Sequence, residues 1–190
     1  MSTSPPGAPT AAQVCSHFEL SEPARGLLQP EMKPRPYLET LIEKKLNDDA
    51  VMLMAHAMPK REAIWWACQC VRMASGAGLA PQSADMIAAA ESWVANPTDE
   101  HRRKAFEKAE AANFDPPAGF LGMAVFFSSG SLSLPNLPPV PPKDHLSAGM
   151  VGNAVKVAAV AQGGDKAHQL YPQFFAVGFD VAAGKNRWNE

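Results

Sequence analysis

The sequence has few cysteines and no excess of either charge. Its three cysteines are too few, and odd in number, for the disulfide framework of a small secreted domain. The formal net charge is −2, so bulk electrostatics favour neither nucleic acid nor an anionic membrane as a partner. The segment 119–142 lacks charge, but its proline, serine and glycine make it a poor bilayer helix. The first residues lack the basic and apolar regions of a signal peptide, so we expect a cytoplasmic protein without a membrane span.

Catalytic and metal-binding motifs are also lacking. The histidines are scattered through the chain and none has the helical pair spacing of a metalloprotease. Cys68 and Cys70 are two residues apart, and on a helix such side chains point to nearly opposite sides. A zinc site also needs a second pair of ligands, and none follows at a suitable spacing. We therefore expect no metal, no cofactor and no identifiable catalytic residue.

Helical periodicity is what the sequence does contain. Alanine is abundant, β-branched residues are modest in number, and no stretch predicts a convincing strand. The pattern predicts an all-α protein, either an irregular multi-helix bundle or a short helical solenoid, with about seven or eight helices. We expect a disordered N-terminal tail over residues 1–20, a helical domain over 21–184 and a frayed C-terminal tail over 185–190. The three prolines within 29–36 predict an extended connector.

The segment 61–74 is predicted to be the central helix, because apolar residues occupy almost its whole circumference. One side is small or β-branched, which allows another helix to approach closely. The opposite side combines aromatic rings with polar side-chain ends. Tryptophan and arginine side chains often anchor protein partners. This side is a candidate partner-binding surface; it carries Glu62, Trp65, Trp66, Gln69 and Arg72. The more ordinary interpretation is that the tryptophans pack inside the fold, with their indole N–H groups satisfied locally.

A proline-rich segment, LPNLPPVPP at 134–142, is the second candidate. Proline runs adopt the extended polyproline II conformation, which a partner can bind at little entropic cost. Leu137, Pro138, Pro139 and Val140 are the candidate contact residues. The alternative, which we favour, is that the segment packs across the protein's own tryptophans and buries its leucines and valine.

Three stretches carry a family resemblance: residues 61–68 (REAIWWAC), 91–94 (ESWV), and the run from GSL at 130–132 to LPPVP at 137–141. Together they resemble a bacterial family of small helical proteins that has no assigned activity and is often encoded near type VI secretion genes. The similarity covers roughly residues 20–184. It implies an accessory role and supplies no catalytic residues.

The leading hypothesis is a non-enzymatic adaptor or chaperone-like protein that holds a protein partner, with a secretion component as the partner that the resemblance implies. A second hypothesis is a small enzyme with a polar pocket formed by Glu62, Arg72 and His56. A third is a structural subunit of a homo-oligomer. A deep pocket with converging titratable groups would favour the enzyme over the other two.

Overall fold

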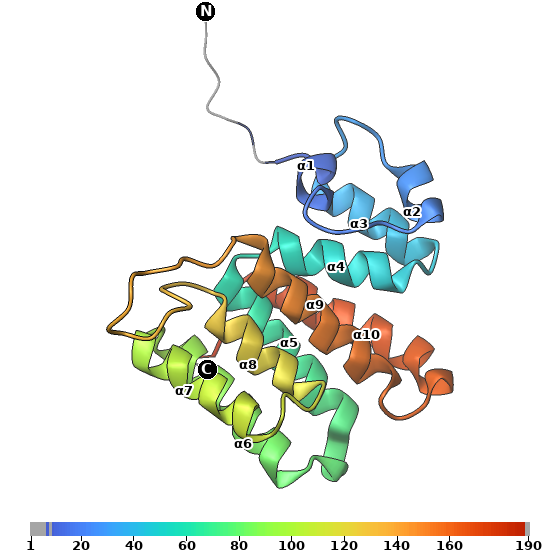
Figure 1. The fold of residues 1–190 in the computed structure, drawn as a ribbon. Coiled ribbons are helices and arrows are strands. Elements are labelled where there is room, and N and C mark those ends of the chain that lie inside the picture. Colours follow the sequence, from blue (N-terminus) through green and yellow to red (C-terminus); the bar gives the residue numbers. More distant parts are fainter. Residues whose placement is uncertain (1–6, 8, 189–190) are drawn as a thin grey trace, which may run out of the picture.

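The computed structural model describes residue 7 and residues 9–188 of the chain, and this part is helical without a strand (Figure 1). The prediction of an all-α multi-helix bundle is confirmed. Eight of the described helices are longer than six residues, and two short ones precede them. The elements are α1 (Ala11–Cys15), α2 (Glu22–Leu27), α3 (Pro34–Glu43), α4 (Asn47–Ala57), α5 (Lys60–Ser75), η1 (Gly76–Gly78), α6 (Pro81–Ala95), α7 (Asp99–Ala111), α8 (Ala118–Phe126), α9 (His145–Val160) and α10 (Gly164–Ala182).

Helix α5 lies at the centre of the bundle, as its apolar circumference predicts. It contacts α6, α8, α9 and α10. Its small face is buried, and α9 brings its own small residues, such as Ala154 and Ala158, to the shared core. Trp66 is fully buried, and its indole Nε1 donates a hydrogen bond to the Phe174 carbonyl of α10 at 2.8 Å. None of the described helices has both the length and the apolar character that crossing a membrane requires.

The expectation of a disordered N-terminal tail is wrong for residues 9–20; residues 1–6 and 8 lie outside the described part of the chain. Thr10 and Gln13 form a capping box at the start of α1. This satisfies N–H groups that the first helical turn leaves without partners. Val14 and Cys15 are buried, and α1 packs on α3 and α4. Composition suggested disorder, but capping and burial together order this short helix.

The expectation of an extended connector over 29–36 is wrong at its end, because α3 already begins at Pro34. Proline lacks an N–H group, yet the first N–H groups of a helix have no intrahelical acceptor in any case. Pro34 and Pro36 both lie in the first turn of α3. They therefore cost no hydrogen bond and can start the helix.

Helices α7 and α8 cross closely at a glycine. A Cβ atom placed on Gly122 of α8 would overlap the Ala109 side chain and lie 2.8 Å from the backbone oxygen of Ala105, both on α7. A backbone oxygen held within a helix cannot move aside easily. Glycine at this position thus sets how closely α8 approaches the helix that anchors the following loop.

We predict that Gly122→Ala destabilises the protein by about 1–3 kcal/mol, because the added methyl group overpacks this crossing. Gly149, inside α9, has open space around an added Cβ. There the same substitution should stabilise by about 0.5–1 kcal/mol, since alanine is the better helix former. Chemical denaturation of both variants checks the pair. Equal free energies of unfolding for the two variants would contradict the close crossing.

Candidate protein-binding surface

The loop between α8 and α9 projects from the bundle and runs over the α7 end of the molecule (Figure 1). We call residues 131–142 the proline loop. Its base is closed by the Leu132 amide, which donates to the Val140 carbonyl at 2.8 Å. The Ser131 hydroxyl accepts hydrogen bonds from the Val140 amide at 2.9 Å and the Ser133 amide at 3.1 Å. The proline loop is therefore a closed, hydrogen-bonded hairpin-like turn.

The apolar side chains of the proline loop face solvent. Leu134, Leu137 and Val140 have exposed fractions of 65%, 54% and 52%, higher than those of the other large apolar side chains in the described part of the chain. Pro138 and Pro139 are exposed as well. The expectation that this segment packs across the tryptophans and buries these residues is wrong. The reason is that hydrogen bonds hold the backbone of the proline loop against α7.

Arg102 on α7 makes that attachment, although its side chain is completely buried. Its guanidinium donates to the Phe126 carbonyl at 2.8 Å and to the Ser131 carbonyl at 2.9 Å. Two of its nitrogens also reach Oδ1 of Asp99, at 2.8 and 2.6 Å. A buried cation needs such partners to offset its desolvation. One side chain thus joins α7, the last residue of α8 and the base of the proline loop.

Arg103 and Asp99 complete the attachment. Arg103 donates to the Ser133 carbonyl at 3.1 Å and to Oδ2 of Asp99 at 2.8 Å. Hydrogen bonds from Arg102 and Arg103 lower the pKa of the Asp99 carboxyl group. Gly130 enters the loop with a φ of +67°, and an added Cβ would lie 3.1 Å from the Arg102 guanidinium. In the sequence, the i,i+3 and i,i+4 spacing of Arg102 and Arg103 from Asp99 is the signal that could have indicated this cluster.

The protein's own C-terminal residues pack against part of the tryptophan side of α5. Trp65 is half-buried, and its indole nitrogen donates to the Asn186 side chain at 3.1 Å. The Arg61 guanidinium lies over the Trp188 ring at 4.2 Å. The expectation of a frayed tail is therefore wrong for 185–188, while residues 189–190 lie outside the described part. This tail packs because it caps an aromatic surface that would otherwise face water.

The other predicted residues of this side do not form one surface. Trp66 is buried in the core and cannot meet a partner, so its assignment to a binding surface is wrong. Arg72 makes a bidentate ion pair with Glu91 of α6, and both hydrogen bonds are 2.7 Å long. Gln69 is half-exposed beside it. The Arg72–Glu91 ion pair thus links α5 to α6.

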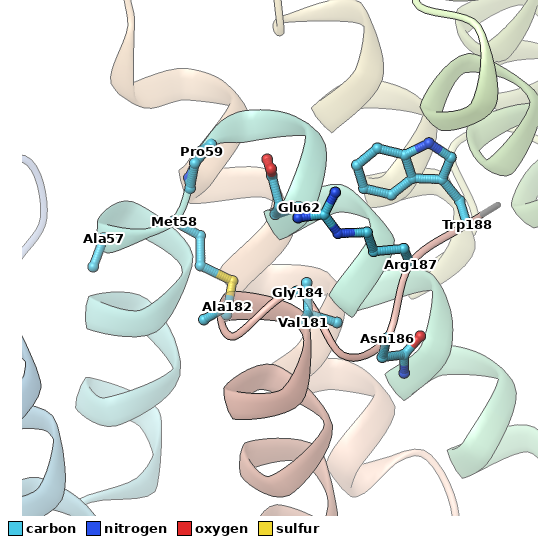
Figure 2. Close-up of a pocket in the computed structure, with 10 residues that line it drawn as sticks. All are labelled: Ala57, Met58, Pro59, Glu62, Val181, Ala182, Gly184, Asn186, Arg187 and Trp188. Carbon is cyan, nitrogen blue, oxygen red and sulfur yellow. The ribbon is translucent and has the colours of Figure 1, made fainter. Parts of the chain in front are cut away.

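The predicted polar pocket of Glu62, Arg72 and His56 is not formed. Glu62 lines a pocket of about 240 Å³ with Arg187 and Trp188 (Figure 2). Arg72 is ten residues further along α5, about 15 Å at 1.5 Å per residue. His56 lies on α4, where its Nδ1 is 2.8 Å from the Met52 carbonyl oxygen. The three groups do not line one pocket, so the enzyme hypothesis loses the residues it was built on.

The cysteines are buried as free thiols. Burial raises the pKa of Cys68 and Cys70, and it raises that of Cys15 to about 11, with a smaller contribution from Asp49. A thiol in this state is a poor nucleophile, because the thiolate is the reactive form. Within the described residues, no group of three or more His, Cys, Asp or Glu side chains has an arrangement suited to a metal ion.

A histidine cluster is a feature that the scattered sequence positions did not predict. The His17 ring stacks on His145 at 5.7 Å and on His56 at 6.4 Å between centroids. Phe18 packs against His56 at 4.8 Å. These residues come from the N-terminal segment, α4 and the start of α9. Their meeting depends on the packing of α1, and no local spacing reveals it.

With the geometry established, comparison with protein families gives one result. The model of a family of unknown function, DUF6931, matches residues 37–182. The chain belongs to this family. The matched range of this DUF6931 protein runs from α3 to the end of α10 and so includes Arg102 and the proline loop. Neither the curated proteins nor the solved structures gave a match to the chain.

We predict that Arg102→Ala lowers the free energy of unfolding by on the order of 3 kcal/mol, because buried carbonyl oxygens lose a charged donor. Lys104→Ala, at an exposed position of the same helix, should change it by less than about 0.5 kcal/mol. Urea denaturation measures both. A small effect of Arg102→Ala would mean that the attachment contributes little.

We also predict that acidification weakens the fold through His56. Burial lowers the pKa of His56 below 6.5, and nearby His17 and His145 lower it further, although its hydrogen bond to Met52 opposes this. The unfolded chain therefore binds a proton first, so stability falls as the pH drops below about 6.5. Denaturation of wild type and His56→Gln from pH 8 to 5 checks this. The variant should lose less stability over that range, and a parallel loss would refute the assignment.

Proposed function

We propose that this DUF6931 protein is a non-enzymatic adaptor or chaperone-like accessory protein of the cytoplasm that binds a protein partner through the proline loop. The observation that carries the proposal is the exposure of Leu134, Leu137 and Val140 on a loop whose base is fixed by a buried arginine. Large apolar side chains gathered on one exposed loop commonly mark interaction sites. A loop that is already ordered loses less conformational entropy on binding, which favours affinity.

The chemistry of the loop suggests how the partner binds it. Pro138 and Pro139 lie between two exposed apolar side chains. Proline-rich segments of this kind dock into aromatic-lined grooves, because their extended backbone is already formed. The partner is thus expected to present an apolar or aromatic groove. The likeness of residues 61–68, 91–94 and 130–141 to bacterial proteins encoded near type VI secretion genes supports a secretion component as that partner.

The test is affinity capture from the native bacterium with two tagged proteins. A variant with Leu134→Ser, Leu137→Ser and Val140→Ser removes the exposed apolar side chains without touching the Arg102 attachment. We expect recovery of a stoichiometric partner to fall at least about tenfold, as loss of central apolar anchors does at other interfaces. Its free energy of unfolding should stay close to that of wild type, because these side chains are solvent-exposed.

Val160→Ser is the matched control, since Val160 is 49% exposed on α9 and lies outside the loop. It should leave capture unchanged. Equal recovery with wild type and the loop variant would contradict the proposal. Light scattering across concentration separates the remaining possibility: a complex of identical chains that the loop variant dissociates would identify a structural homo-oligomer subunit.

A further inference from the structure

A second hollow in the molecule is a groove of about 450 Å³ between α3, α4 and α10. Its floor consists of the buried side chains of Leu38, Leu53 and Met54. Met58 and Phe179, both partly exposed, line it as well. The lining is therefore almost entirely apolar, and two methionines give it a surface that can adapt to different shapes.

The groove extends beyond this floor toward the end of α10. Ala57, Met58 and Ala182, which Figure 2 shows in the smaller pocket beside Glu62, also line the groove, so the two hollows adjoin. Ala57 and Ala182 are exposed and small.

Positive charge lies at the start of α3, where Lys33 and Arg35 line the groove. The Arg35 guanidinium stacks over the Phe179 ring at 4.0 Å, which holds it at the wall of the groove. Its Nε donates a hydrogen bond to Oε1 of Glu39 at 2.6 Å. A guanidinium has five N–H donors, so this one bond leaves donors for an incoming carboxylate. The groove thus pairs an apolar floor with a cationic edge.

We propose that this groove binds a short acidic peptide segment of a protein partner. This segment is distinct from the partner surface that binds the proline loop. One or two apolar side chains of the segment pack on Met54 and Met58, and an Asp or Glu beside them lies against Arg35. Charge complementarity selects an acidic occupant and disfavours a basic one. The groove is open to solvent, which suits a peptide laid across it better than a fatty acid that must be enclosed.

The probe is a random library of peptides of about 12 residues displayed on phage, selected on the full chain, because this length spans a groove of this kind. We expect the enriched peptides to share apolar residues next to Asp or Glu. The best one is then synthesised with a fluorescent label, and its affinity is measured by anisotropy. A second peptide with its acidic residues changed to Lys tests the role of charge.

Variants locate the site. Ala182→Trp fills the groove and should weaken the peptide at least about tenfold, as loss of a central contact area does. Ala176→Trp is the matched control, since Ala176 is exposed on the same helix and does not line the groove. Arg35→Glu should weaken the acidic peptide and strengthen the Lys peptide. The proline-loop variant should bind like wild type, so this result stands apart from the proposed adaptor function.

Four outcomes would overturn the proposal. The first is the absence of any enriched peptide, and the second is an enriched motif without an acidic residue. The third is binding that Ala182→Trp leaves unchanged. The fourth is that decanoate binds, that Ala182→Trp abolishes its binding, and that no peptide binds. This result would assign the groove to an anionic amphiphile.

Discussion

The burial of the Arg102 guanidinium is the constraint on which the proposed binding surface depends. A cation inside a protein must find acceptors, and this one finds them on three separate pieces of chain: Asp99 within α7, the Phe126 carbonyl at the end of α8, and the Ser131 carbonyl beyond it. Meeting that requirement draws the segment after α8 across α7. It also decides which way the segment faces, because its carbonyl groups turn inward and its apolar side chains remain in solvent.

The location of the two proposed binding surfaces follows from how the centre of the fold is packed. Helix α5 places Trp66 in the core, and its Arg72 forms an ion pair with Glu91. Trp65 is hydrogen-bonded to Asn186 of the C-terminal tail. Its aromatic side is therefore committed to holding the protein together. The two proposed binding surfaces, the proline loop and the apolar groove beside α3, lie outside this side of α5. Two such surfaces would suit the proposed adaptor role.

The sequence predicts the all-α fold and the central helix α5, because apolar residues recur along 61–74 with helical periodicity. It predicts the candidate surfaces less well. Helical periodicity places Trp65 and Trp66 on one side of α5, yet Trp66 lies in the core, and Trp65 is hydrogen-bonded to a tail residue 121 positions later. In the sequence, nothing distinguishes Arg102 from its charged neighbours. Its role depends on the hydrogen bond to Ser131, which lies 29 residues later. Proline content likewise misled at Pro34, where position within the first turn matters more than composition.

Amide hydrogen exchange at Leu132 and Val140 tests the central claim most directly, since both amides are hydrogen-bonded only if the proline loop is held closed. The account predicts slow exchange at both in the wild-type protein. It also predicts fast exchange at both in an Arg102 variant under conditions where the amides of α5 remain protected. Fast exchange at both positions in the wild type would contradict the claim that this loop is a preformed surface.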